Sequence, residues 1–161
     1  MAEEETLNLA IEIFRDAYRH QMKGELHEAV ELYLHSIETY PTAEAYTFLG
    51  WTYSFMGDYD AAIAECRNAI ETDPDFGNPY NDIGAYLIEK GEIDEAIPWL
   101  EMATRAMRYE NPAFPHFNLG RVWELKHQFA RALASYQMAV EIDARYTLAL
   151  TGIRRLRAMF N

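Results

Sequence analysis

The sequence contains a single cysteine, Cys66, so no disulfide can form within the chain. It also lacks any run of about 18 consecutive apolar residues, the length that a membrane-spanning helix requires. The N-terminal stretch is acidic, whereas a secretory signal begins with basic residues. These absences predict a cytoplasmic protein without membrane insertion.

Motifs that carry common enzymatic chemistry are missing as well. The sequence has no glycine-rich phosphate loop, no zinc-type spacing of cysteine and histidine, and no metalloprotease motif. The five histidines are scattered, and Cys66 has no evident base beside it. We therefore expect no enzymatic activity, no cofactor and no metal ion.

Basic residues are scarce: the chain has 14 Lys and Arg against 26 Asp and Glu, a formal net charge of −12. Such a charge argues against binding nucleic acid or an anionic membrane surface. The imbalance is uneven, with 7 basic and 23 acidic residues in 1–120 but 7 basic and 3 acidic residues in 121–161. This polarity could orient a partner, although a solvated surface is the simpler interpretation.

Apolar residues recur at helical spacing along the chain, and the pattern repeats itself. Residues 46–74, 80–106 and 116–143 align with one another, and residues 13–41 are a weaker copy. One small residue keeps its place in every copy, at intervals of 33, 34 and 36 positions: Ala29, Ala62, Ala96 and Ala132. A period of this size predicts stacked helical units that bury their apolar faces against one another.

The second copy carries a family resemblance through Tyr46, Leu49, Gly50, Tyr53, Gly57, Tyr59, Ala62, Ala69 and Pro74. This set resembles a tetratricopeptide (TPR) unit, whose pattern repeats about every 34 residues. The resemblance implies an all-α fold, a right-handed superhelix of four helix-turn-helix units closed by a C-terminal capping helix. The expected single domain divides into units 10–42, 43–76, 77–112 and 113–146, followed by a terminal helix at 147–160.

Small and polar residues within the units have local roles. Gly50, Gly84 and Gly120 allow the second helix of each hairpin to approach the first closely. Gly24, Gly57 and Gly91 suit the turn between helices, and His127 takes that place in the fourth unit. Helix N-caps are expected at Asp60, Asp94 and Asn78. The third unit is two residues longer than its neighbours, which predicts a longer helix or a bulged loop.

The resemblance divides the aromatic residues into two groups. Those on repeat-signature positions are expected in the core: Tyr46, Tyr53, Tyr59, Tyr80, Trp123, Phe129 and Tyr136. A second group shares helix faces that the family turns toward its concave surface: Phe14, Tyr18, Phe48, Trp51, Phe55 and Phe117. Such a cluster predicts a ligand groove. The alternative is that neighbouring helices or the N-terminal segment cover it.

Polar residues occupy the corresponding face of the third and fourth units, namely Asn78, Asn81, Asn118 and Arg121. Their amides could bond an extended peptide backbone, and Arg121 could meet a carboxylate. One TPR group grips the C-terminal carboxylate of chaperone tails with Lys, Asn and Arg. The matching positions here hold Phe14, Tyr18, Phe48, Asn78 and Asp82, so we do not expect that interaction.

The leading functional hypothesis is a protein–protein interaction module or adaptor. It would bind a peptide or helix of a partner that carries apolar or aromatic anchors. The alternative is a self-assembling scaffold, a homo-oligomer joined through the groove or the terminal helix, where Leu148, Met159 and Phe160 could form an exposed edge.

Overall fold

The computed structural model describes residues 1–161, and its secondary structure is entirely helical. The elements are α1 (Ala2–Met22), α2 (Leu26–Thr39), α3 (Ala43–Phe55), α4 (Tyr59–Thr72), α5 (Asn78–Glu89), α6 (Ile93–Thr104), α7 (Ala113–Leu125), α8 (Phe129–Ile142) and α9 (Thr147–Met159). The all-α prediction is therefore confirmed. No helix has the length and apolar character needed to cross a bilayer.

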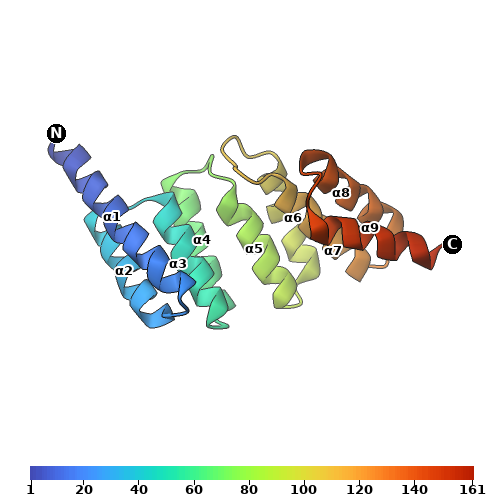
Figure 1. The fold of residues 1–161 in the computed structure, drawn as a ribbon, viewed down its shortest axis with the longest axis horizontal. Helices are drawn as coiled ribbons and strands as arrows, with labels where there is room; N and C mark the ends of the chain where they lie inside the picture. Colours follow the sequence, from blue (N-terminus) through green and yellow to red (C-terminus); the bar gives the residue numbers. More distant parts are fainter.

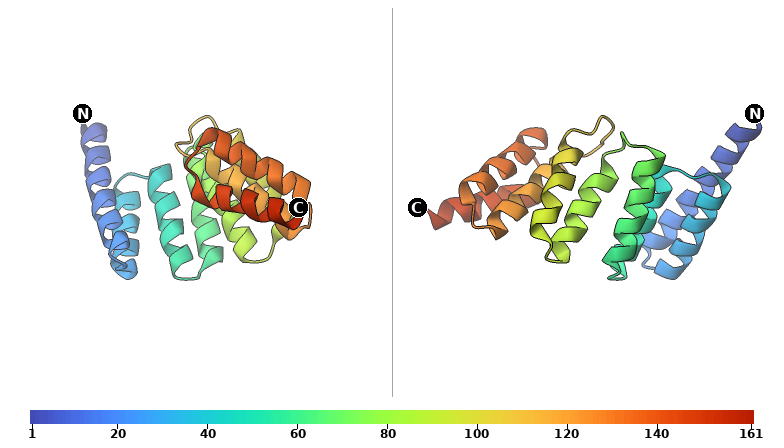
Figure 2. Two further views of the ribbon diagram at one scale, coloured as in Figure 1. Left: turned by 45° about the vertical axis from the view of Figure 1, so that its right-hand side comes forward. Right: turned by 180° about the vertical axis from the view of Figure 1, so that it is seen from behind.

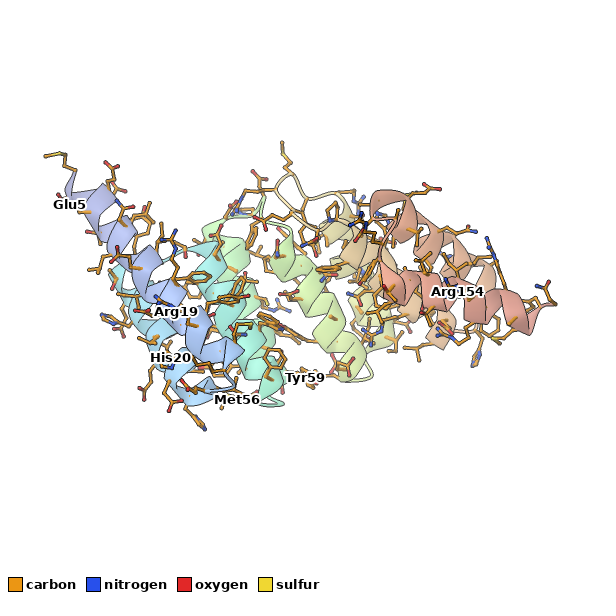
Figure 3. All side chains as sticks on the ribbon, in the orientation of Figure 1. Glu5, Arg19, His20, Met56, Tyr59 and Arg154 are labelled. Atoms are coloured by element: carbon orange, nitrogen blue, oxygen red, sulfur yellow. The ribbon has the colours of Figure 1, made fainter.

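The helices stack as a row of antiparallel hairpins, with the two termini at opposite ends of the molecule (Figure 1). Each odd-numbered helix packs on the even-numbered helix that follows it, and each even-numbered helix then packs on the next hairpin. Helices α1, α3, α5 and α7 also contact one another in sequence. They therefore form the inner layer of a curved array, and the hairpins rotate progressively along it (Figure 2).

Small residues set the distance between the two helices of a hairpin, as the sequence predicts. A Cβ atom on Gly84 would lie 2.4 Å from Leu100, and one on Gly120 would lie 2.4 Å from the Tyr136 ring. A Cβ on Gly50 would lie 2.8 Å from the carbonyl oxygen of Ala62. No side chain fits in these gaps, so glycine is required for the observed packing.

The turn between the helices of each hairpin uses a left-handed residue. Gly24, Gly57 and Gly91 have φ angles of +79°, +79° and +81°. His127 occupies the same place in the fourth hairpin with φ of +57°, and it is the only non-glycine residue with positive φ. This conformation costs a residue with a Cβ about 1 kcal/mol or more.

The expected N-caps are wrong in detail. Asp58, rather than Asp60, caps α4 by accepting a hydrogen bond from the Ala61 N–H. Asp60 lies two positions further on and pairs with Lys90 at 2.7 Å. Its counterpart Asp94 pairs with Lys126 in the same way, one repeat later. The Asn78 side chain also makes no cap, because α5 begins at Asn78 with Gly77 as the N-cap residue.

The core runs along the array between the helix layers. All four recurring alanines are fully buried: Ala29, Ala62, Ala96 and Ala132. Among the signature aromatics, Trp123 and Tyr136 are buried, whereas the other five are partly buried. Four of these five pack against the core clusters, and the fifth, Tyr80, packs beside Trp99. Cys66 is buried and unpaired, and this burial raises the pKa of its thiol well above the ordinary value. It therefore acts as a small core residue.

The longer third unit forms a loop between α6 and α7 that turns back to the preceding repeat. The Gly77 N–H donates to the Arg108 carbonyl at 2.8 Å, and the Arg108 N–H donates to the Asp75 carbonyl at 3.0 Å. The Arg108 guanidinium also pairs with Asp73 at 2.6 Å and Glu44 at 2.7 Å. It thereby lowers the pKa of the Asp73 carboxyl. We call this pairing of 73–77 with Arg108 the inter-repeat clasp.

The last helix covers the exposed side of the fourth hairpin. Helix α9 buries Ala149, Ile153 and Leu156. Its Gly152 lies against the ring of Tyr136. On the rim, Arg155 donates two hydrogen bonds to Glu124, at 2.9 and 2.7 Å, which lowers the pKa of that carboxyl.

Candidate functional site

Five aromatic side chains of α1 and α3 form one continuous cluster on the inner layer. The ring centroids of Phe14 and Phe48 are 5.1 Å apart, and those of Tyr18 and Phe48 are 5.7 Å apart. Trp51 continues the row at 5.6 Å from Phe48, and Phe55 follows at 5.1 Å from Trp51. These spacings are those of interacting aromatic pairs. We call these five residues the aromatic cluster.

Exposure differs along the aromatic cluster. Tyr18 is 40% exposed and Phe55 is 56% exposed, whereas the other three rings are partly buried. Phe14 and Phe48 both pack beside the buried ring of Tyr33, which anchors the cluster to the α1–α2 hairpin. The cluster is therefore neither fully covered by its neighbours nor fully free. Its inner rings are held in place, and its outer rings face solvent.

A cavity of about 390 Å³ opens beside the aromatic cluster, between the second and third repeats. Tyr18, Phe48 and Trp51 line it on one side. Helix α5 and the loop after α6 line the other side with Asn78, Asp82, Tyr109, Glu110 and Asn111. The volume is within the range of pockets that hold one ligand group or one long side chain.

Two of the predicted polar residues are already paired with each other. The Asn118 side-chain amide donates to the Asn81 side-chain oxygen at 2.9 Å, and the two residues are only 7% and 5% exposed. Arg121 donates to Asn118 at 3.2 Å and to Glu89 at 2.8 Å. This chain of bonds joins the third repeat to the fourth. It occupies the amides that sequence reasoning assigned to a peptide backbone.

Asn78 differs from these two asparagines. It lies at the start of α5, and its side-chain oxygen is buried without a hydrogen-bond donor. It lines the cavity. A buried acceptor without a donor is uncommon, because it loses its bond to water and gains nothing in exchange. Asn78 thus combines an unsatisfied acceptor with a place in the cavity lining.

Phe117 lies apart from the aromatic cluster. Its ring packs on Tyr136 and Tyr146, with centroids 5.6 and 5.1 Å away. It lines a second hollow of about 600 Å³, together with Arg121 and residues of α9. The site residues predicted from sequence thus fall into two separate regions of the inner layer. One extends from the first to the third repeat and the other lies at the C-terminal end.

Sequence reasoning did not assign a role to Asp82, which lines the first cavity. Its carboxylate accepts one hydrogen bond, from the Asn81 side chain at 3.3 Å, and takes part in no ion pair. Burial raises its pKa to about 7. Asp82 follows Asn78 by four positions, so both residues lie on one face of α5. The spacing of Asn78 and Asp82 in the sequence therefore indicates that the two residues form one polar wall.

The comparisons with known proteins agree with this architecture. Residues 43–76 match the family model described as the tetratricopeptide repeat. A curated relative, the small glutamine-rich tetratricopeptide repeat-containing protein 2 of Mycosarcoma maydis, is 33% identical over 70 residues. The SGT1 homolog of Oryza sativa subsp. japonica is 37% identical over 75 residues. These alignments cover 43% and 46% of this chain but only 20% of each relative.

Solved structures resemble a larger part of the chain. Pseudomonas aeruginosa PilF superposes with a TM-score of 0.86 at 18% identity, covering 97% of this chain and 69% of PilF. The pilus biogenesis factor PilW gives 0.85 at 17% identity, over 94% of this chain and 70% of PilW. YrrB, described as a TPR protein with an unusual peptide-binding site, gives 0.71 at 18% identity, over 90% and 74%. At such low identity these likenesses establish the fold alone.

Proposed function

Because the chain is a tetratricopeptide-repeat protein, we propose that it is a non-enzymatic interaction module that binds a peptide or helix of a partner protein on its inner layer. The observation that carries the proposal is the aromatic cluster of α1 and α3, which continues without a break from partly buried to exposed rings beside a cavity. Aromatic anchors in concave, partly desolvated surfaces dominate the energy of many interfaces.

The partner segment should carry apolar or aromatic side chains of its own. Rings that are already held by their neighbours lose little conformational freedom when a ligand covers them, so contact area converts efficiently into affinity. An extended peptide or one face of a helix could supply such contacts. The protein has no clamp for the C-terminal carboxylate of a peptide, because the inner positions of the first two repeats hold Phe14, Tyr18 and Phe48.

The test begins with selection of binding peptides from a displayed random library on the intact protein. The affinity of the selected peptide is then measured by fluorescence anisotropy for the parent and two variants. Trp51→Ala should weaken binding by about 2 kcal/mol or more, roughly thirtyfold. Trp99→Ala is the matched control, because Trp99 lies on α6, packed beside Tyr80 and Arg67 and away from the aromatic cluster. It should bind like the parent.

Thermal melts separate a binding role from a core role. Trp51→Ala should lower the melting temperature far less than Tyr53→Ala, because Tyr53 packs against two of the core clusters. Losing a packed aromatic side chain costs about 3–5 kcal/mol of stability. Equal losses for Trp51→Ala and Tyr53→Ala would assign Trp51 to the core and remove the main support for this groove.

We propose self-assembly as the second candidate, on the basis of one observation at the C-terminal end. Leu148, near the start of α9, is 60% exposed, and Phe160, just after its end, is 67% exposed. Met159, the last residue of α9, is exposed as well. Light scattering across a concentration series tests it. A mass that stays at one chain favours the adaptor, and a dimer that Leu148→Asp dissociates favours assembly.

A further inference from the structure

The first cavity has an acidic and acceptor-rich wall that faces an aromatic wall. On α5, Asp82 and Asn78 both line the cavity, and the side-chain oxygen of Asn78 is buried without a hydrogen-bond donor. Glu110, from the loop after α6, adds a second carboxylate to the lining. Tyr18 and Trp51 lie on the opposite side. A group that fits this cavity must donate hydrogen bonds, and it meets negative charge and ring faces together.

No cation of the protein fills that role. The lining residues include no Lys, Arg or His. Asp82 acts electrostatically on Cys66 of α4, Tyr86 of α5 and Tyr109 of the loop, and all three are neutral. The other charged residue of the lining, Glu110, is acidic. The nearest basic group along the polar chain, Arg121, is already bonded to Asn118 and Glu89. The Asp82 carboxylate is thus desolvated without a counter-ion.

A desolvated carboxylate without a partner is costly, and proteins tolerate it chiefly where it serves a function. A cation placed beside it recovers that cost, and aromatic faces add attraction when the cation is desolvated. Planar guanidinium groups satisfy both demands, because they stack on rings and donate several hydrogen bonds at once. An ammonium group satisfies them as a point charge.

We propose that this cavity is the receptor for one basic side chain, an arginine or lysine, presented by the partner segment that the aromatic cluster holds. The proposal rests on the proposed function and makes it more specific. The basic group would lie between Asp82 and the ring of Trp51, and it would donate to the Asn78 side-chain oxygen. The formal charge of the first 120 residues, with 23 acidic and 7 basic residues, also favours a basic segment.

The experiment uses small probes, so it does not depend on knowing the partner. The intact ¹⁵N-labelled protein is titrated with n-butylguanidinium, with n-butylammonium and with the neutral, nearly isosteric n-butylurea. Both cations should shift the Trp51 indole N–H and the backbone signals of 78–82 and 109–111, whereas n-butylurea should leave them in place. Equal shifts with n-butylurea, or cation shifts spread over other acidic surfaces, would overturn the proposal.

Two variants isolate the carboxylate. Asp82→Asn removes the charge and keeps the shape, and it should weaken n-butylguanidinium binding at least tenfold. Asp16→Asn is the matched control, because it removes the same charge from an exposed position on α1. It should bind like the parent. An unchanged affinity for Asp82→Asn would contradict the proposal.

The parent protein offers an independent measurement that needs no variant. The Asp82 carboxyl has its pKa raised to about 7, so it gains its charge between pH 6 and pH 8. Affinity for n-butylguanidinium should therefore rise about tenfold over that interval, since the probe stays charged throughout. A flat profile would refute the role of Asp82.

The outcomes also separate this proposal from the proposed function. If Trp51→Ala abolishes binding of the selected peptide while Asp82→Asn leaves cation binding intact, the aromatic groove stands and the basic-side-chain receptor falls. If the cations bind through Asp82 but Trp51→Ala leaves the selected peptide bound, the receptor stands and the aromatic groove falls.

Discussion

The unpaired carboxylate of Asp82 makes a prediction about stability that is independent of any ligand. Its pKa is raised from 3.8 to about 7 by burial, so the native protein keeps this proton at a pH where the unfolded chain has lost it. The stabilising effect of that proton is fully present below about pH 4. It is lost as the pH rises toward 7. Replacing Asp82 with asparagine removes the titration, so the variant should gain stability over the parent as the pH rises.

The size of the effect follows from the shift. A change from 3.8 to about 7 is about 3 units, which corresponds to about 4 kcal/mol when fully expressed. With the carboxyl ionised in both states at pH 8, we expect Asp82→Asn to stabilise the protein by about 4 kcal/mol at pH 8 and by about 1–2 kcal/mol at pH 5. For a chain of 161 residues the value at pH 8 corresponds to about 8–16 °C in melting temperature.

The assay is urea unfolding followed by circular dichroism at both pH values, for the parent, Asp82→Asn and Asp16→Asn. The exposed control should show no pH-dependent difference from the parent. If Asp82→Asn is less stable than the parent at pH 8, or if its advantage is the same at pH 5, the carboxylate is not desolvated and the reasoning fails.

Three further predictions concern the array itself. His127→Gly should raise the melting temperature, because glycine adopts the left-handed conformation without strain, for a net gain of about 0.5–1 kcal/mol. An unchanged or lower melting temperature in differential scanning calorimetry would contradict this. Gly120→Ala should destabilise the protein by about 1–3 kcal/mol in urea unfolding, because the new methyl group would lie 2.4 Å from the Tyr136 ring; a parent-like midpoint would show that the hairpin can widen. Deleting 146–161 should lower the melting temperature and cause aggregation, because it uncovers the fourth hairpin; a soluble truncation with the parental melt would exclude a capping role for α9.

The helices were predictable because their signals are local and repeated. Apolar spacing, turn glycines and small residues recur in four copies, so an error in one copy is corrected by the others. The position of an N-cap depends on a single residue, and no other copy of the repeat corrects an error there. Asp60 was expected to cap α4, but Asp58 lies two positions earlier and does so. Asp60 then becomes free to pair with Lys90 in the next repeat.

The candidate site was predictable only where it depends on one helix face. Phe48, Trp51 and Phe55 share a face of α3, and their spacing in the sequence indicates this directly. The bond between Asn81 and Asn118 joins residues 37 positions apart, and Tyr109, which interacts with Asp82, comes from the loop at the far end of the same unit. These features depend on how α5 packs on α7 and where the clasp holds the loop, which no local pattern specifies.

The inter-repeat clasp has a consequence for the range of partners. Two backbone hydrogen bonds and two ion pairs of Arg108 tie the loop after α6 to the repeat before it. The same loop supplies Tyr109, Glu110 and Asn111 to the cavity wall. Helix faces joined only by apolar side chains can slide and let a groove widen, as in proteins that accept many ligands. Here hydrogen bonds and ion pairs connect one wall of the cavity to the other, so the cavity keeps its width. If the proposed site binds a side chain, this fixed width favours one shape of side chain over promiscuous binding.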